Sequence, residues 1–242
     1  MLKTIMINIA TVLGFLIGVP FLFIFLLAMI NRNTKAVIAK RFGINGQLIF
    51  GFLGVIIHEA SHLIVALVFG HKIKTVRLIR RPTIDNPSLG YVNHTWQPRN
   101  LYQTIGNLFI GVAPIFGCCT TILFLARWLL PNIYNRLVTL TYQPLSITAV
   151  PAFQWGPMLL FILLTANICI GGFDLSSSDY RNSIQGLATT ILLLISLTIV
   201  LSLIPIGTTV FAALYQAIKV ITVISTFNLL ISAVLNLVFK LI

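Results

Sequence analysis

Long apolar runs separated by short polar segments define the pattern of this 242-residue chain. A membrane-spanning helix needs about 20 predominantly apolar residues. Six runs approach or exceed that length: 1–30, 46–70, 102–130, 151–173, 187–204 and 208–242. The pattern therefore predicts an all-α polytopic membrane protein with about six transmembrane helices. We expect residues 1–242 to form a single integral membrane domain.

Two of these runs have features beyond their length. The first contains about 25 apolar residues, which exceeds a signal-peptide core, and it lacks an A-x-A cleavage site, so we expect a retained span. In the fourth run, the strongly apolar part at 158–170 is too short to cross a hydrocarbon core of about 30 Å. A broken helix would resolve this, with Gly171, Gly172 and the following DLSSSDY as irregular backbone facing an internal cavity.

The polar segment 71–99 has a different pattern. Alternating KIKTVRLIR and LGYVNHTW flank the turn-rich PTIDNPS, which favours a small β-hairpin-like loop over an ordinary basic loop. If this segment is cytoplasmic, its Lys and Arg residues follow the positive-inside rule, and the polar connector 31–45 lies outside.

The composition agrees with a membrane protein, at 58% hydrophobic and 8% charged residues. The formal net charge is +12, but the positive residues lie between apolar runs, where topology and anionic headgroups account for them. We therefore expect a lipid bilayer and not nucleic acid as a partner. Cys118, Cys119 and Cys169 lie in apolar runs without CxxC spacing and are expected to be packing residues.

The second run carries the sequence HEASH at residues 58–62. On a helix, His58 and His62 are four residues apart on one face, so both imidazoles reach one metal ion. Glu59 projects beside them toward a water on that metal, and the spacing suits zinc chemistry.

The membrane setting makes this motif more specific than it would be in a soluble helix. An ionisable side chain near the bilayer centre costs roughly 2.5 to 3.5 kcal/mol on insertion scales. Three such residues at one depth therefore indicate a site. The alternative is that they hydrogen-bond to neighbouring helices as packing contacts.

The HExxH motif in a membrane helix, the basic hairpin-like loop and a later membrane-associated aspartate together resemble the site-2 protease family of intramembrane zinc metalloproteases. The resemblance implies a zinc ion bound by His58, His62 and a distal aspartate, Glu59 as the catalytic base, and peptide-bond hydrolysis within the bilayer. That family usually has Asn-Pro leading to Asp-Gly at its second motif. Here Asn167 precedes the aspartates without an intervening proline, and neither aspartate is followed by glycine.

Two aspartates in the second motif, at about 171–186, are candidates for the third ligand. We favour Asp179 because it begins a helical pattern, and a rigid element carries metal ligands better than the stretch around Asp174 does. Alternatively, Ser176 and Asp179 form a capping box that only stabilises the helix start. If neither aspartate is the ligand, His71 or His94 remains, although we expect both interfacial histidines to be solvated.

Two asparagines lie in apolar runs and are candidates for stabilising an oxyanion. Asn107 and Asn167 are polar enough for this role. Buried asparagines more often bridge helices, and we favour that role for both.

Two hypotheses about function remain. The first is a zinc metalloendopeptidase acting on a membrane-embedded or membrane-associated protein or peptide. The second is a membrane transporter or a metal-binding pseudoprotease without proteolytic activity. We expect an integral protein of a bacterial cell membrane.

Overall fold

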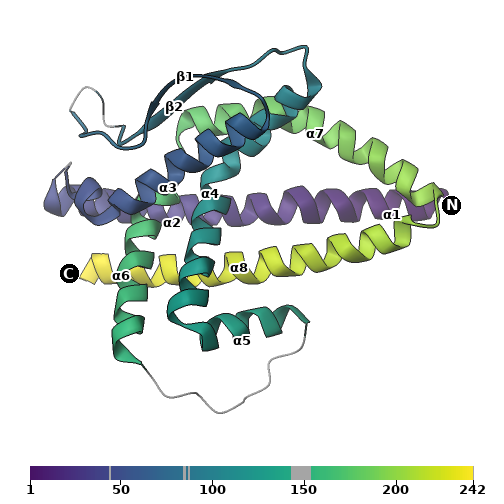
Figure 1. The fold of residues 1–242 in the computed structure, drawn as a ribbon. Helices are drawn as coiled ribbons and strands as arrows, with labels where there is room; N and C mark the ends of the chain where they lie inside the picture. The colour runs from purple at the N-terminus through teal and green to yellow at the C-terminus, as the bar shows by residue number, and fades with distance from the viewer. Residues whose placement is uncertain (44, 84–85, 87, 143–153, 242) are drawn as a thin grey trace.

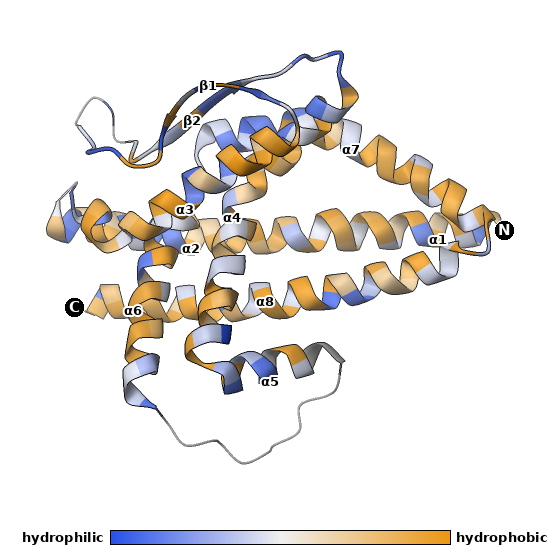
Figure 2. Ribbon diagram, viewed as in Figure 1, coloured by the Kyte–Doolittle hydropathy of each residue, from blue (hydrophilic) through white to orange (hydrophobic). Residues whose placement is uncertain are grey.

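The computed structural model describes residues 1–43, 45–83, 86, 88–142 and 154–241, and it is almost entirely helical. Within these residues, six helices are long and apolar enough to cross a membrane, which confirms the predicted fold class. A two-stranded sheet is the only β structure among them. Figure 2 shows apolar residues along the long helices and more hydrophilic residues in and beside the sheet.

The first span is one continuous 41-residue helix, Leu2–Phe42. It comprises α1 (Leu2–Leu13), a π-helical turn at Gly14–Gly18, and α2 (Val19–Phe42). The prediction of a polar connector at 31–45 is therefore wrong over most of that range. Residues 31–42 contain no Gly or Pro, and the helix ends at Gly43, whose φ is 75°.

Two polar residues of this extension, Asn31 and Thr34, are buried and pair with α8 (Gly207–Leu241). The amide of Asn31 donates to Ser232 Oγ at 3.1 Å, and that of Asn236 donates to Thr34 Oγ1 at 2.9 Å. The nearly constant sequence offset between partners shows that α2 and α8 run parallel, as Figure 1 also shows. Buried polar groups therefore join the two ends of the sequence.

The HEASH segment lies on α3 (Gly46–Val68). This helix packs against α4 (Leu101–Leu129) and α6 (Trp155–Gly172). α3 packs against α6 through glycines: a Cβ on Gly54 would lie 2.6 Å from the carbonyl oxygen of Ile168. This contact agrees with the small-residue surface expected for membrane helix packing.

The fourth span differs from the predicted broken helix. Gly171 and Gly172 are the last residues of α6, which is 18 residues long, and the irregular backbone is confined to Phe173–Ser176. The next helix, α7 (Ser177–Leu203), begins about ten residues before the apolar run at 187 because the Ser176 capping box starts it. Asp174 and Ser176 of the irregular segment line a cavity, as expected for non-helical backbone at this depth.

The remaining elements are short. α5 (Pro131–Tyr142) lies between the third and fourth apolar runs, and 143–153 lies outside the described residues. β1 (Lys72–Arg77) and β2 (Tyr91–Thr95) pair antiparallel with Val76 opposite Val92, which confirms the hairpin-like loop. The three cysteines are buried, in agreement with a packing role.

Candidate metal centre

Helix α3 presents the three ionisable residues of HEASH to one cavity of about 510 Å³. His58, Glu59 and His62 retain only 8%, 8% and 6% of their exposure. The cavity lies between α3, the start of α7 and the residues 88–94 before and within β2. The three side chains are thus buried in the protein and line the cavity.

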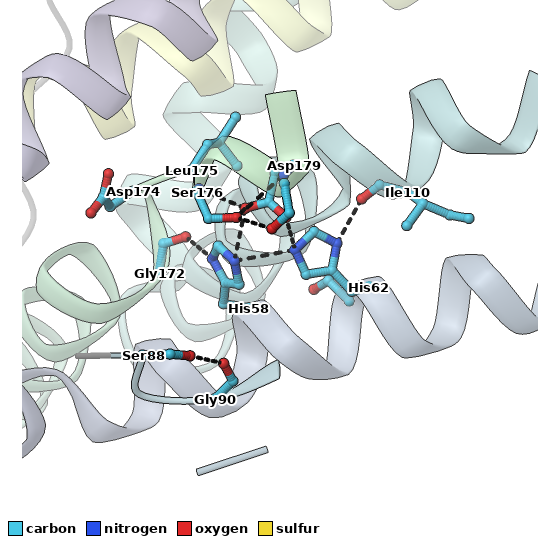
Figure 3. Close-up of polar contacts among 12 residues, drawn as sticks. His58, His62, Ser88, Gly90, Ile110, Gly172, Asp174, Leu175, Ser176 and Asp179 are labelled. Atoms are coloured by element: carbon cyan, nitrogen blue, oxygen red, sulfur yellow. Dashed lines mark hydrogen bonds and ion pairs between the residues drawn. The ribbon is translucent and has the colours of Figure 1, made fainter. Parts of the chain in front are cut away.

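The two histidine rings are oriented by main-chain carbonyls. His58 Nδ1 lies 2.9 Å from the carbonyl oxygen of Gly172, and His62 Nδ1 lies 2.7 Å from that of Ile110. A carbonyl only accepts, so each Nδ1 carries the proton and each Nε2 lone pair is free. Figure 3 shows both Nε2 atoms facing the same point, and they are 3.2 Å apart. Outer contacts of this kind are typical of metal-binding histidines.

Asp179 of α7 completes the cluster. Its Oδ1 lies 3.1 Å from His62 Nε2, and its Oδ2 lies 3.7 Å from His58 Nε2. The carboxylate is 6% exposed. The structure therefore brings together the two histidines and the aspartate that the sequence favoured.

Asp179 is also a capping residue. The Ser176 N–H and Oγ each donate to Asp179 Oδ2 at 2.7 Å, and the Asp179 N–H donates to Ser176 Oγ at 3.2 Å. The sequence presented the cap and the ligand as alternatives. The structure shows one carboxylate in a position to serve both, with Oδ2 held by the cap and Oδ1 directed at His62.

The donor set fits a tetrahedral metal ion. Zinc binds imidazole nitrogen at about 2.0 to 2.1 Å, and a tetrahedral angle then separates two ligand atoms by about 3.4 Å. The two Nε2 atoms are 3.2 Å apart and His62 Nε2 lies 3.1 Å from Asp179 Oδ1, whereas the 3.7 Å distance from His58 Nε2 is to the other oxygen, Oδ2. One donor atom from each of the three residues lies within 4.8 Å of the other two. Two imidazole nitrogens and one carboxylate oxygen could therefore hold one metal ion.

Glu59 lies in the same cavity but is not part of the donor cluster. Its carboxylate makes no hydrogen bond or ion pair with any described residue. Gly90, which precedes β2, packs on the stem of Glu59: a Cβ there would lie 2.6 Å from Glu59 Cγ. The absence of a side chain at Gly90 lets the β2 segment close directly over this carboxylate, a feature that the sequence did not indicate.

Asp174, the alternative ligand, points elsewhere. Its carboxylate lies 3.5 Å from Arg32 Nε and 3.5 Å from Lys35 Nζ, both on α2. These ion pairs tie the irregular segment before α7 to the extended part of α2. Figure 3 shows Asp174 directed away from the two histidines.

The histidines after α3 do not join the donor cluster either. The prediction that His71 is solvated is wrong, because it is only 4% exposed. Its Nδ1 lies 3.0 Å from His94 Nδ1. His94 is half-buried and lines the cavity.

The asparagines differ from each other. Asn167 Oδ1 accepts from the Leu53 N–H at 2.8 Å, so it bridges α6 and α3, the favoured role. Asn107 is fully buried, and its amide has no hydrogen-bond partner among the described residues. Neither asparagine lines the cavity at the metal centre.

The chain matches no protein-family model, and comparisons with curated proteins and with solved structures give no match either.

Proposed function

We propose that this protein is an intramembrane zinc metalloendopeptidase that hydrolyses peptide bonds of membrane-embedded or membrane-associated substrates. The observation that carries the proposal is the convergence of the His58, His62 and Asp179 donor atoms beside Glu59 in one cavity among apolar helices. Ionisable residues at such a depth are costly and are typically functional. As a location we propose a bacterial cell membrane, which cell fractionation would test.

The donor set supports zinc as the metal. Imidazole suits zinc well, and two histidines with one carboxylate are a ligand set of catalytic zinc sites. His58, His62 and Asp179 would hold the zinc ion, which would supply Lewis-acid activation of a water molecule by lowering its pKa to about 7. In the neutral rings of His58 and His62, Nε2 is unprotonated and could bind a metal ion, because Nδ1 donates to the Gly172 or Ile110 carbonyl.

Glu59 is the residue placed to move protons. It lies on the same helix turn as His58, faces the same cavity and has no competing partner among the described residues. Its carboxylate takes a proton from the attacking water and returns it to the amine of the departing peptide. The close approach of Gly90 restricts the carboxylate on one side.

The substrate must present an extended backbone. A transmembrane helix hides its carbonyls in hydrogen bonds, so it has to unwind before attack. Residues Tyr91–Asn93 of β2 line the cavity opposite the HEASH face, and among the described strands β2 pairs only with β1. Its other edge offers backbone groups that could hold an unwound substrate strand by β-augmentation.

The test compares wild-type protein with Glu59→Gln. Both are purified in detergent, assayed for zinc per chain, and incubated with a pooled library of apolar peptides whose new termini are read by mass spectrometry. We expect about one zinc per chain in both proteins, and cleavage reduced at least about 100-fold in the variant because the amide cannot accept the proton. Equal cleavage by both proteins would exclude Glu59 as the base. A transporter would bind zinc and cut nothing in either form.

A further inference from the structure

A second pair of histidines, His71 and His94, lies outside the donor cluster, and one of them, His94, lines the same cavity. His71 follows the end of α3, where its N–H donates to the carbonyl of Ala66 at 2.9 Å. His94 lies on β2 and lines the cavity. Their Nδ1 atoms are 3.0 Å apart, so one of the two nitrogens donates to the other.

The direction of that hydrogen bond follows from a third residue. His71 Nε2 lies 2.8 Å from the main-chain carbonyl of Gln103, which can only accept, so Nε2 carries the proton. In neutral His71 the Nδ1 atom is then the acceptor, and His94 Nδ1 must donate to it. It follows that Nε2 of neutral His94 carries a lone pair and no proton.

The carbonyl that sets this direction is itself fixed. Gln103 donates through its side-chain amide to the Gly70 carbonyl at 2.8 Å and accepts from the Gln97 N–H at 2.7 Å. The ring of Trp96 stacks on His71 with an interplanar angle of 20°. His71 is therefore held on two sides, by the Gln103 carbonyl of α4 and by the ring of Trp96, which follows β2.

The charges of the pair agree with this assignment. Burial lowers the pKa of His94 to about 4, with smaller contributions from the neighbouring His71 and His62. Burial also lowers the pKa of His71, which the Gln103 carbonyl partly offsets. Both rings are thus neutral near pH 7.

We propose that His94 Nε2 is a substrate-binding acceptor that takes a hydrogen bond from a backbone N–H of the peptide in the cavity, and that His71 is a positioning residue for it. The inference rests on the proposed peptidase function. His94 Nε2 has no hydrogen-bond partner among the described residues, although the ring lines the cavity. An unwound peptide carries N–H groups that need acceptors in an apolar environment.

Two substitutions of His94 separate its two nitrogens. His94→Asn keeps a short amide that can donate to His71 but places no acceptor where Nε2 was. His94→Gln places an amide oxygen near the Nε2 position and is the matched control. Both are made in the full chain with Glu59→Gln, so that binding is measured without cleavage, and neither substitution touches a metal donor.

The probe is a fluorescein-labelled alternating leucine–alanine peptide, used as a series in which each backbone N–H in turn is replaced by N-methyl. Losing one hydrogen bond should weaken binding about 5-fold. We expect His94→Asn to bind the peptide about 5-fold more weakly and His94→Gln to retain most of the affinity. For the protein with His94, one N-methyl peptide should bind about 5-fold more weakly than the unmodified peptide. For the His94→Asn protein, the same two peptides should bind with equal affinity.

The protonation of the two His94 nitrogens distinguishes an acceptor role from a purely structural one. Nitrogen NMR of labelled histidine should show protonated Nδ1 and unprotonated Nε2 at His94, and His71→Leu should remove this preference. A protonated Nε2 in the wild type would overturn the proposal, as would a loss of affinity from N-methylation that is the same with and without His94. Failure of any peptide to bind would overturn it too.

These results are separable from the peptidase test. Cleavage by the wild type, combined with unchanged binding in His94→Asn, would reject the acceptor while the peptidase function stands. The expected binding pattern without any cleavage would support the acceptor and reject hydrolysis.

Discussion

Ser176→Ala tests whether the helix cap also positions a metal ligand. The Ser176 hydroxyl donates to Asp179 Oδ2 at 2.7 Å and accepts from the Asp179 N–H at 3.2 Å. Alanine removes both of these hydrogen bonds. The bond from the Ser176 main-chain N–H to Oδ2, also 2.7 Å, remains. The carboxylate is therefore loosened but not removed.

Two effects of different size follow from this change. Loss of an N-cap hydroxyl costs about 1 kcal/mol, which for a chain of this size corresponds to roughly 2 to 4 °C in Tm. Loss of an outer hydrogen bond to a metal ligand typically weakens metal binding about 10- to 100-fold. Because the main-chain N–H still holds Asp179 Oδ2, we expect zinc affinity to fall by about 10-fold, at the lower end of that range.

The assay titrates zinc against a chelator of known affinity and measures Tm on zinc-free protein in the same detergent. Ser177→Ala is the matched control, because Ser177 is exposed and its hydroxyl makes no hydrogen bond with a described residue. Equal zinc affinity and equal Tm in Ser176→Ala and Ser177→Ala would exclude a role of the Ser176 hydroxyl in both the helix cap and the metal site. A fall in Tm with unchanged zinc affinity would leave Asp179 as a cap only.

Three further predictions concern the donor atoms and the cavity. His58→Ala and His62→Ala should each lose most of the roughly one zinc per chain measured by mass spectrometry, and stoichiometric zinc in the double variant would exclude the site. Asp179→Asn should lose most zinc while Asp174→Asn keeps it, because only Asp179 lies beside the imidazoles; the opposite result would reverse the assignment. The pKa of His94, lowered by burial to about 4, predicts that between pH 6.5 and 4 only the unfolded chain gains this proton. The Tm of zinc-free protein should therefore fall on acidification through that range, less steeply in His94→Gln, and equal slopes would contradict the lowered pKa.

The spans and the HEASH part of the candidate metal site are predictable because their signals are local. An apolar run of sufficient length predicts a membrane helix whatever it packs against. The His58 and His62 spacing places both rings on one face from helix geometry alone. Asp179 was favoured over Asp174 because it begins a helical pattern, and a rigid element carries metal ligands better than an irregular stretch.

The features missed from sequence depend on partners distant in the chain. The helix continues through Asn31 because Ser232, 201 residues later, accepts its amide hydrogen. The carbonyls of Gly172 and Ile110 that fix the histidine tautomers are backbone atoms, which every residue has, so no residue type marks them. The burial of His71 likewise follows from the position of α4.

The donor distances are set by helix packing and not by the ligands alone. A Cβ on Gly111 of α4 would lie 2.5 Å from the carbonyl oxygen of Asp179, so α7 reaches the site only because that position has no side chain. On the other side, a Cβ on Gly51 of α3 would lie 2.8 Å from the main-chain nitrogen of Gly171, so α3 and α6 are in backbone contact. Membrane interiors supply little hydrophobic driving force between helices, so close packing of this kind carries much of the association. Tight packing of α4 on α7 and of α3 on α6 thus brings one donor atom each of His58, His62 and Asp179 within 4.8 Å of the others.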